Sequence, residues 1–592
     1  MAGQRHLETL LNCYCREVAA PQGQLRAGPP FGHGDWPIAV RMALQRLGGQ
    51  VLHVQLPHMR DRLLVVVESA SPTGNYRYLS PLFHKAQGKP WALLDWHSLA
   101  TLLLHELALQ QGSPLNTELL DQMQNSVDVA RAVLAQPVPV ALPPDPQAAY
   151  IESEQSLTFG HPFHPTPKAR QGFNADDLLR YSPELRTRFA LHWFAVREQD
   201  VIQRSLQEEA CSALVARHAP AVPPGMVAVP VHPWQAGYLR NLPQVRAALN
   251  AGRLQYLGEQ GEAFYPTSSV RTLYQPGNPY FYKLSLNIRI TNCVRKNAWY
   301  ELESAMAVNR LLRPLLPVLQ QQFPALAVME EPAFMSVDLG LPDERENREV
   351  IEGFGMILRR SVDLLRLPGS TPLLAGALFG NHCFGEARVR HILQELANRE
   401  GRPLIEVATQ WFESYLQHLL PPVLQLYFAH GVVFEPHLQN VVLGLKDGWP
   451  VQVYLRDFEG VKLLPEHYPG TALSDVNQRA RESLWYDAEL GWKRIGYCLF
   501  VNNLCEVIAQ MAALHLGLQP RLWRAVRHQL LDYQARFGTP ASEPRINALL
   551  CGEPFPAKTN LLNRFWQRAD RASAYLSVSN PLATFGVEDR WN

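Results

Sequence analysis

The run from His430 to Gly460, HGVVFEPHLQNVVLGLKDGWPVQVYLRDFEG, constrains the fold more than any other part of the chain. Val441–Leu445 and Val451–Leu455 are apolar, β-rich segments, and the residues between them, Lys446–Gly448, have the composition of a turn. They predict an antiparallel hairpin, in which the start of the first strand lies beside the end of the second. That end of the hairpin gathers one imidazole, two amides and two carboxylates: His437, Gln439, Asn440, Asp457 and Glu459.

An oxygen-rich set of this kind is what holds Mg²⁺ on nucleotide phosphates, because Mg²⁺ takes few carboxylates and shares phosphate oxygens. Protein kinases use a related arrangement, with an Asn before a hairpin and an Asp-Phe-Gly after it. Here Asp457-Phe458-Glu459-Gly460 has the second position. The alternative is an ordinary hairpin with polar ends, and this stretch alone leaves both interpretations open.

Length predicts several lobes, because 592 residues exceed what one hydrophobic core holds. We expect an α+β fold divided into an N-terminal α/β lobe (1–145), a central lobe with the nucleotide-binding strands (146–370) and a mainly helical lobe with the hairpin (371–592). The proline-rich connector 137–150 marks the first boundary. The formal net charge of +1 provides no global field for nucleic acid or for an anionic membrane, so neither is expected as a partner.

The N-terminus does not read as a signal peptide, because Asn12, Arg16 and Glu17 interrupt its apolar residues. No apolar run of about 18 residues is evident, so we expect no membrane span. The eight cysteines are scattered, and neither Cys13-x-Cys15 nor the pair Cys498 and Cys505 has a matching second pair. We therefore expect reduced thiols in a cytoplasmic protein and no zinc site.

A stiff basic loop, GHPFHPTPKARQGF, occupies residues 160–173. Prolines restrict its backbone, while Gly160 and Gly172 permit unusual angles. No acid lies within the loop to compensate its cations, which favours binding of a polyanion such as a tricarboxylate or a phosphate. The alternative is a solvated loop. The candidate ligand-binding residues are His161, His164, Lys168 and Arg170.

Residues 265–297 predict two paired strands joined by a turn at Gln275–Pro279. Ser269 and Arg271 share a face of the first strand. Along the second strand, residues alternate between an apolar face and a polar face that carries cations and hydroxyls but no acid. Such a floor fits recognition of a triphosphate or a carboxylate through charge-assisted hydrogen bonds, against the alternative of a solvent-exposed sheet face. The polar face holds Lys283, Ser285, Asn287, Arg289 and Thr291, and the apolar face holds Leu284, Leu286, Ile288 and Ile290.

Elsewhere the pattern predicts strands at Val51–Leu56, Arg62–Glu68 and Val227–Val231. Helices are predicted at His6–Ala19, Leu93–Gln111, Leu115–Leu134, Ser182–Ala216, Glu489–Leu516 and Pro520–Arg536. A further helix, Leu404–Leu420, is expected to break at Pro421 and Pro422.

Six motifs in a fixed order resemble one known family, the siderophore synthetases that act without a nonribosomal peptide synthetase. Aerobactin and achromobactin synthetases are members. The motifs cover residues 155 to 460, and the length and expected lobes are similar over nearly the whole chain. In order, the motifs are GHPFHPTPKARQGF, HPWQ, SSVRTL, KLSLNIRITNCVR, FEPHLQN and RDFEG.

The resemblance implies a three-lobed, hand-like fold of thumb, fingers and palm, whose C-terminal lobe is distantly kinase-like. It implies that ATP and Mg²⁺ are used to adenylate a carboxylate, usually of citrate, and that an amine or alcohol then displaces AMP. We also expect a homodimer. The implied ATP-binding residues are Ser269, Arg271, Thr272, Lys283, His437, Gln439 and Asn440. The implied metal residues are Asp457 and Asn440, the catalytic residues Arg295, Lys283 and His437, and the acid-binding residues His161, His164, Lys168, Arg170, Thr291, Arg295 and Arg359.

The chemistry of adenylation agrees with the residues present. A carboxylate is a poor electrophile, and a mixed anhydride with AMP provides a leaving group. The enzyme must then hold two anions, a carboxylate and an α-phosphate, against each other. Their repulsion requires several cations and a metal at one point, which the hairpin and the predicted floor provide together.

Two other functions compete with this interpretation. A small-molecule kinase fits the hairpin, but the chain lacks a kinase glycine-rich loop and an Asp before Asn440. A non-catalytic binder of citrate or ferric citrate fits the cations. Within the family, citrate is favoured over α-ketoglutarate or a citryl monoamide, and the nucleophile is not readable. The family's C-terminal region is sometimes likened to ferric reductases, but this chain lacks the clustered cysteines of an iron–sulfur site.

Overall fold

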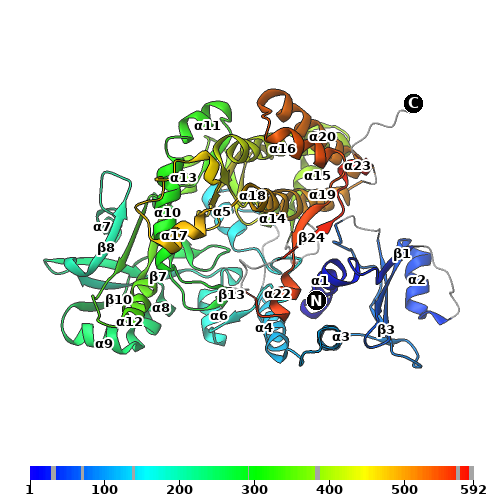
Figure 1. Cartoon of the computed structure of the whole chain (residues 1–592), viewed down its shortest axis with the longest axis horizontal. Coiled ribbons are helices and arrows are strands. Elements are labelled where there is room, and N and C mark those ends of the chain that lie inside the picture. Colours follow the sequence, from blue (N-terminus) through cyan, green and yellow to red (C-terminus); the bar gives the residue numbers. More distant parts are fainter. Residues whose placement is uncertain are drawn as a thin grey trace.

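The computed structural model describes residues 1–28, 35–68, 73–136, 141–290, 293–380, 387–515, 517–568 and 574–585. Helices and strands are mixed along the chain, and the predicted α+β class is confirmed. The elements form three groups (Figure 1): an N-terminal group, a sheet-rich central group at the opposite end, and a helical C-terminal group between and above them. The hand-like description, its distant likeness to kinases and the division at residues 145 and 370 stay predictions.

The N-terminal group is a five-stranded sheet, ordered β1-β2-β3-β4-β5, with helices packed beside it. The predicted strands and helices of this region are confirmed, with ends shifted by a few residues. Its elements are α1 (Ala2–Tyr14), η1 (Cys15–Ala19), β1 (Leu25–Gly28), α2 (Ile38–Leu47), β2 (Gln50–Leu56), β3 (Asp61–Val67), β4 (Phe83–Lys85), β5 (Ala92–Leu93), α3 (Trp96–Gln111) and α4 (Thr117–Leu134).

The central group contains an antiparallel eight-stranded sheet, ordered β8-β16-β17-β12-β11-β10-β7-β9. Its first elements are α5 (Pro146–Glu154), β6 (Arg170–Gln171), α6 (Ala175–Tyr181), η3 (Pro183–Leu185), β7 (Phe189–Arg197), η4 (Glu198–Asp200), β8 (Val201–Ser205), α7 (Cys211–Ala216), β9 (Met226–Val231), α8 (Pro233–Asn241), α9 (Pro243–Asn250) and β10 (Leu254–Pro266). Then follow β11 (Thr272–Tyr274), β12 (Tyr280–Leu284), β13 (Arg289–Ile290), β14 (Cys293–Val294), α10 (Trp299–Leu312), α11 (Leu316–Gln322), β15 (Leu326–Val328), β16 (Ala333–Val337), α12 (Glu344–Phe354), β17 (Met356–Arg360) and α13 (Val362–Leu365).

Two sequence predictions fail in this group. Ser182–Ala216 is predicted to be helical, but it contains the strands β7 and β8 between short helical segments, because a short, continuous apolar run such as FALHWFAV fits a buried strand as well as a helix. The predicted continuous strand at 283–291 ends at Leu284. The N–H of Ser285 still bonds to Gly355, the next position in register before β17, but the N–H of Leu286 bonds to Arg295, which lies on none of the strands that pair with β12. Val227–Val231 is confirmed as part of β9.

The C-terminal group is mainly helical and includes a four-stranded sheet, β15-β21-β20-β18, to which the central segment contributes β15. Its elements to residue 484 are β18 (Thr371–Leu374), α14 (Ala375–Phe379), α15 (Arg388–Glu400), α16 (Leu404–His430), β19 (Val432–Val433), β20 (Val441–Lys446), β21 (Trp449–Leu455), β22 (Lys462–Leu463), η5 (Pro465–His467) and α17 (Gln478–Leu484). The others are α18 (Ala488–Ile495), η6 (Gly496–Cys505), α19 (Glu506–Ala512), α20 (Leu518–Phe537), α21 (Ser542–Leu550), β23 (Phe555–Lys558), α22 (Asn560–Phe565), β24 (Tyr575–Val578) and α23 (Leu582–Phe585).

The central hairpin is confirmed. β20 and β21 pair antiparallel from Val441↔Leu455 to Lys446↔Trp449, which leaves Asp447-Gly448 as a two-residue turn. Both turn residues have positive φ, 51° and 85°, as a type I′ hairpin turn requires. The open end of the hairpin therefore brings His437–Asn440 next to Asp457–Glu459, as the sequence predicts.

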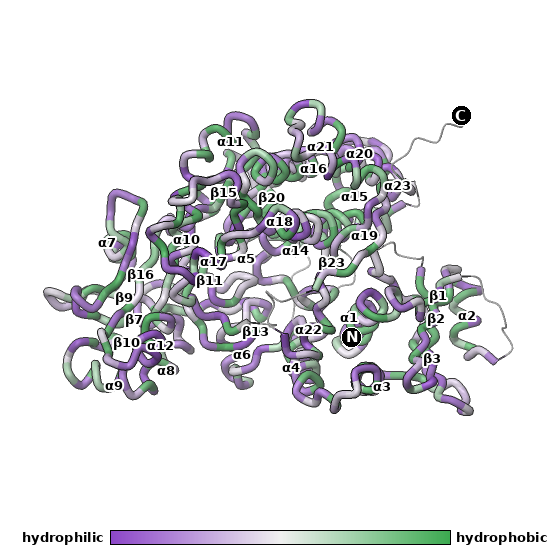
Figure 2. The backbone as a smooth tube through the Cα atoms, viewed as in Figure 1, coloured by the Kyte–Doolittle hydropathy of each residue, from purple (hydrophilic) through white to green (hydrophobic). Residues whose placement is uncertain are grey.

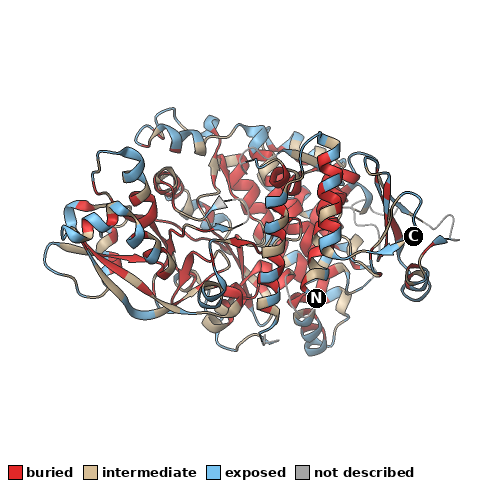
Figure 3. Cartoon of the chain, turned by 90° about the horizontal axis from the view of Figure 1, so that it is seen from below, coloured by how far each residue is buried: buried red, intermediate tan, exposed pale blue. Residues whose placement is uncertain are grey.

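The prediction that Pro421 and Pro422 end a helix is wrong, since α16 continues through them to His430. Each proline removes a helical hydrogen bond. The loss is offset because α16 lies in the core, with Trp411, Phe412 and Tyr415 completely buried. Figure 3 shows this concentration of buried residues along the central helices, and Figure 2 shows their hydrophobic composition.

One helical run, Ala488–Ala512, is long and apolar enough to cross a membrane by length and composition, contrary to the expectation that no such run exists. Its most apolar window is 83% buried inside the protein, which is typical of a core helix.

The two ends of the chain meet at α22, which lies beside α1 (Figure 1). Glu17 accepts hydrogen bonds from the backbone N–H groups of Asn560, Leu561 and Leu562, at 2.9–3.0 Å, and so caps α22. Asn560 in turn donates to the carbonyl oxygen of Phe163, at 2.8 Å. The loop at 160–173 is therefore fixed between the two ends of the chain.

We predict that Glu17→Gln lowers the thermal midpoint of unfolding, because the carboxylate that accepts all three N–H groups is lost. Hydrogen bonds to a charged acceptor contribute about 1.5–3 kcal/mol each. Differential scanning fluorimetry measures the shift, with Glu68→Gln, an exposed carboxylate on the same lobe, as the control. Equal midpoints for the two variants would contradict this role of Glu17.

Candidate active site

A strained turn places the first predicted residues of the site. Thr267 and Thr272 close the turn through a 2.9 Å backbone hydrogen bond, and the Ser269 hydroxyl accepts the Thr272 N–H at 3.2 Å. Val270 at its tip has φ 70°, a costly conformation for a β-branched residue, of about 1–3 kcal/mol. Ser269 and Arg271 therefore lie on this turn and not on a strand, which corrects the sequence prediction.

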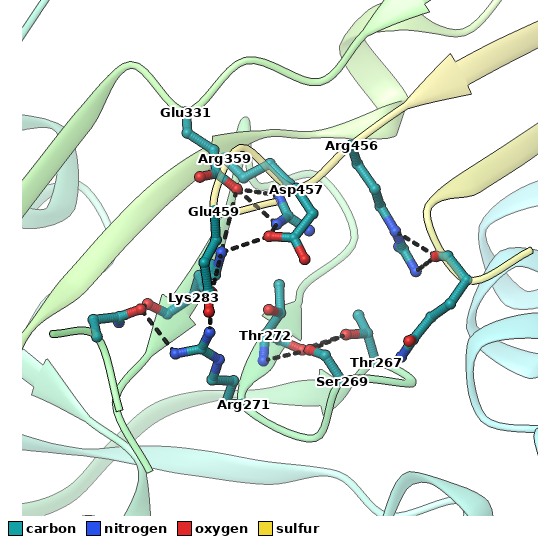
Figure 4. Close-up of polar contacts among 12 residues, drawn as sticks. Thr267, Ser269, Arg271, Thr272, Lys283, Glu331, Arg359, Arg456, Asp457 and Glu459 are labelled. Atoms are coloured by element: carbon teal, nitrogen blue, oxygen red, sulfur yellow. Dashed lines mark hydrogen bonds and ion pairs between the residues drawn. The ribbon is translucent and has the colours of Figure 1, made fainter. Parts of the chain in front are cut away.

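Arg271 extends from the turn into the protein and joins three segments (Figure 4). Its Nη2 pairs with Glu459, beyond the hairpin, and its Nη1 donates to Asn297 Oδ1 at 2.9 Å. Asn297 also donates to the carbonyl oxygens of Lys283 and Gly355, both at 2.9 Å. Asn297 thus fixes Arg271 relative to Lys283. It ends the motif stretch, but sequence reasoning assigned it no role.

Lys283 is the centre of the polar cluster. Its ammonium lies 2.6 Å from Asp457 Oδ1, 3.2 Å from Glu459 and 3.8 Å from Glu331. Burial lowers the pKa of Lys283, but the three carboxylates outweigh it and hold the pKa above its ordinary value. Burial likewise raises the pKa of Asp457, and the charges of Lys283 and Arg359 outweigh it, so that Asp457 is ionised.

Arg359 lies in the same cluster. Its guanidinium donates to Glu331 Oε1 from Nε at 2.9 Å and from Nη2 at 2.6 Å, and Nη2 reaches Asp457 at 3.2 Å. Glu331 is completely buried, and its second oxygen has no hydrogen-bond partner among the described residues. Glu331 orients both Arg359 and Lys283. Glu331 lies tens of residues after Lys283 and tens of residues before Arg359, so no local sequence motif identifies it.

Arg456 and Glu154 hold the hairpin against the strained turn. The two side chains form a buried ion pair, and Arg456 Nη2 also donates to the Gln439 carbonyl at 2.8 Å. Glu154 accepts the Ser268 N–H at 3.1 Å, and Gln439 Nε2 donates to the Ser268 hydroxyl at 3.4 Å. Asp457, which follows Arg456, has φ 79°. Left-handed residues therefore occur on both loops that meet here, as is common at functional sites.

The other hairpin residues lie where the sequence predicts. A tight turn, with the Asn440 N–H donating to the His437 carbonyl at 2.9 Å, puts both residues at the open end. His437 and Gln439 are half-buried and Asn440 is buried. Burial lowers the pKa of His437 below its ordinary value, so its ring is neutral at pH 7. A neutral ring accepts or donates one hydrogen bond at each nitrogen.

In the basic loop, the expectation that no acid compensates the cations is wrong. Glu184 pairs with Lys168 and accepts two hydrogen bonds from Arg170 Nη2, at 2.8 and 2.7 Å. Lys168 also donates to the Leu157 carbonyl at 2.7 Å. All three charged side chains are buried. Sequence reasoning missed Glu184 because it lies outside the loop, on the short turn η3.

Arg170 has hydrogen-bonding capacity left. Its Nε and Nη1 have no hydrogen-bond partner among the described residues. Arg170 pairs with Ile290 across β6 and β13, and the Ile290 carbonyl accepts from Arg295 Nη2 at 3.4 Å. The basic loop and residues 265–297 therefore meet at Ile290, which pairs with Arg170 and accepts a hydrogen bond from Arg295.

The two histidines of the loop accept backbone N–H groups through Nδ1, His161 from Phe163 and His164 from Thr166. Burial lowers the pKa of His161 to about 3, and His164 and His437 interact electrostatically with it in the same direction. His161 is thus neutral and close to His437. Thr291, the remaining predicted residue, lies outside the described residues. Arg359 lies beside Asp457, and its predicted contact with the acid stays a prediction.

Comparison with known proteins identifies relatives along the whole chain. A family model described as the IucA / IucC family matches residues 149–380. An N(2)-citryl-N(6)-acetyl-N(6)-hydroxylysine synthase of Vibrio mimicus is 30% identical over 464 residues, 74% of this chain and 75% of the relative. A spermidine-citrate ligase of Bacillus anthracis is 26% identical and is covered, like this chain, over 97% of its length.

Among solved structures, ATP-bound aerobactin synthetase IucA of Klebsiella pneumoniae matches with a TM-score of 0.80, at 24% identity, over 98% of this chain and 99% of that chain. This likeness shows a shared fold. A second family model, a ferric iron reductase FhuF-like transporter, matches residues 409–573. Among the described residues no group of three or more His, Cys, Asp or Glu is arranged to hold a metal ion.

We predict that Glu331→Gln lowers kcat/KM for ATP by about tenfold or more, the effect of losing a charged hydrogen bond of about 1.5–3 kcal/mol. The neutral amide orients Arg359 and Lys283 less firmly, although its volume is nearly the same. Steady-state kinetics with ATP varied measures the change.

The matched control is Glu330→Gln. Glu330 is adjacent in sequence but pairs with Arg360, a partly exposed residue outside the cluster. Equal kinetics for the two variants would contradict an orienting role for Glu331.

Proposed function

We propose that this chain, which belongs to the IucA / IucC family, is an ATP-dependent ligase of siderophore biosynthesis that adenylates a carboxylate of citrate and joins it to an amine. Relatives named for their reactions join citrate to spermidine, to L-2,3-diaminopropanoate and to an acetylated hydroxylysine. All three co-substrates are amines, which favours an amine over an alcohol as the nucleophile here.

The observation that carries this proposal is the meeting of Arg271, Lys283 and Arg359 with Asp457 and Glu459 at one junction of strand, turn and hairpin. The cations are fixed by buried partners, so they need little rearrangement to stabilise charge that develops on a phosphate. The side chains of Asp457 and Glu459 remain 33% and 32% exposed, which leaves the cluster open to a ligand. Adenylation requires this combination, because it brings a carboxylate against an α-phosphate.

Mg²⁺ is part of the proposal, and the residues fit it. Within the cluster, carboxylates offset the charges of the cations, so a triphosphate would meet Asp457 and Glu459 as like charges without a further cation. Asp457 and Asn440 offer the oxygen ligands that Mg²⁺ prefers, and few carboxylates are needed when phosphates share the ion. The ion would neutralise phosphate charge during adenylation.

For the acid, we propose that Arg170 and Arg295, which both contact Ile290, hold citrate. The Nε and Nη1 of Arg170, which have no hydrogen-bond partner among the described residues, lie on different edges of the guanidinium, and each can donate one charge-assisted hydrogen bond to an oxygen of the acid. His161, neutral and next to His437, is the proposed third contact. Lys168 is already paired with Glu184 and bonded to Leu157, which supports a structural role. Arg359, beside Asp457, is proposed to act on the phosphates.

Product analysis tests the reaction class. Purified enzyme is incubated with ATP, Mg²⁺, one acid (citrate, α-ketoglutarate or a citryl monoamide) and one amine (spermidine, 2,3-diaminopropanoate or an N-hydroxylysine derivative). The proposal expects AMP and pyrophosphate with citrate. ADP as the product would indicate the kinase alternative. Absence of ATP turnover would indicate a non-catalytic binder of citrate or ferric citrate. The same panel of acids tests whether citrate is the preferred acid.

A cytoplasmic location and a homodimer are also proposed. Cys13, Cys15, Cys211, Cys505 and Cys551 form no disulfide in the described part of the chain, and the apolar helical run found there, Ala488–Ala512, lies in the core. Light scattering on the eluting size-exclusion peak measures the mass of the assembly.

We predict that Asp457→Asn reduces Mg²⁺-dependent turnover by about two or more orders of magnitude, as expected for loss of a key electrostatic group. Volume hardly changes, so circular dichroism should match the wild type. Turnover near the wild-type rate at saturating Mg²⁺ would remove Asp457 from the site.

We predict that Arg170→Lys raises KM for citrate by about tenfold or more, and KM for ATP little, because lysine keeps the charge beside Glu184 but lacks the Nε and Nη1 donors. The estimate follows from a charged hydrogen bond of about 1.5–3 kcal/mol. Arg186→Lys is the control, since Arg186 is a nearby arginine paired with Glu152. An unchanged KM for citrate would leave Arg170 with a structural role alone.

A further inference from the structure

Glu301, in the first turn of α10, is a carboxylate beside the cluster that the reaction above does not use. Its Oε2 accepts the Ala298 N–H at 2.9 Å, and its Oε1 accepts the Tyr300 hydroxyl at 3.0 Å. These two bonds fix the carboxylate in place. Glu301 forms no ion pair among the described residues, and it is half-buried, so ligands reach it. In contrast, Asp457, Glu459 and Glu331 are all paired with cations.

The charged groups around Glu301 come from four segments. Glu459 and Arg271 belong to the nucleotide cluster and interact electrostatically with Glu301. Lys462, on β22, also interacts with it. On its own helix Tyr300 donates to it, and the Arg479 guanidinium of α17 lies 4.5 Å from the centre of the Tyr300 ring. Glu301 is therefore within electrostatic reach of residues that the proposed function assigns to ATP.

The pKa of Glu301 is suited to a group that accepts a proton near neutral pH. Burial and then the negative charge of Glu459 raise the pKa of Glu301 to about 7. Burial, followed by the charge of Arg494, lowers the pKa of Lys462 to about 8. A base whose pKa lies near the working pH transfers protons most effectively.

The proposed reaction needs such a group. The amines named for the relatives are cations near neutral pH, and a protonated nitrogen has no electron pair with which to attack. The cations of the cluster, which the proposed function assigns to the phosphates and the carboxylate, repel an ammonium. An unpaired carboxylate at the edge of the cluster offsets this repulsion.

We propose that Glu301 is the catalytic base of the second half-reaction: its carboxylate binds the ammonium of the amine substrate and accepts a proton from it beside the acyl adenylate. This inference rests on the proposed function. It assigns the amine to the α10 side of the cluster. There a carboxylate binds the cationic amine, whereas the proposed acid-binding arginines bind the anionic acid.

The step balances as follows. Glu301 takes one proton from the ammonium and becomes a neutral acid. The freed nitrogen pair attacks the acyl carbon, the C–N bond forms, and the bond to the AMP oxygen breaks with its electron pair leaving on AMP. The nitrogen then loses its second proton to water, and Glu301 later returns its own proton to solvent.

The test separates the two half-reactions in Glu301→Gln. Glutamine retains the oxygen that accepts the Ala298 N–H, as in a capping box, so the helix should stay folded. Citrate-dependent ATP–pyrophosphate exchange, and trapping by hydroxylamine, which is uncharged at neutral pH, should remain within a fewfold of wild type. Amide formation with the best amine of the panel should fall by about 10²-fold or more.

Glu346→Gln is the matched control, because Glu346 has the same position in the first turn of α12 but is exposed and has no role in the proposed site. It should leave all three rates unchanged. In the wild type, the rate of amide formation should rise with pH through about 7, as Glu301 loses its proton. That rise should be absent in Glu301→Gln.

Three results would overturn the proposal. Amide formation in Glu301→Gln at the wild-type rate would show that Glu301 is not the base. Equal losses of pyrophosphate exchange and amide formation would show that it supports only the nucleotide site. A wild-type enzyme without citrate-dependent exchange would overturn the proposed function, and this inference with it.

Discussion

The ion pair between the buried Lys283 and the half-buried Asp457 is the interaction on which the site depends. It joins the central sheet to the end of the hairpin, 174 residues later in the chain. Without Asp457 the buried ammonium of Lys283 would lose its nearest counter-charge, so the pair strongly constrains how the two segments meet. Arg271, Arg359, Glu331 and Glu459 extend the pair into a network, and this network forms the junction proposed to bind the phosphates.

Three further contacts keep this network in one arrangement. The Arg456–Glu154 pair holds the hairpin against the turn at Val270, and Asn297 fixes the backbone of Lys283. The left-handed backbone at Val270 and Asp457 persists because these contacts overdetermine it. Preorganised charge is useful here, since an enzyme that joins two anions gains most from cations already in position. The unpaired carboxylate of Glu301 adds the opposite charge where a cationic amine must arrive.

Local patterns predicted much of this, and their limits are physical. The hairpin follows from two β-rich runs around a two-residue turn, and its polar ends follow from the pairing geometry. By contrast, Glu184 and Glu331 compensate cations from distant segments, so nothing near Lys168 or Lys283 in the sequence indicates them. The sequence predicts a helix where β7 forms, because a short apolar run carries no distinguishing period. α16 passes through two prolines because tertiary burial outweighs local propensity. The six ordered motifs identified the family, while individual roles stay predictions.

The central claim is that the junction activates citrate before any amine is present. The most direct measurement is exchange of radiolabelled pyrophosphate into ATP by the wild-type enzyme, with Mg²⁺ and citrate and without an amine. The account predicts label in ATP that depends on citrate and disappears when citrate is omitted. Label exchange that is absent with citrate, while an amine and citrate together produce ADP, would contradict it.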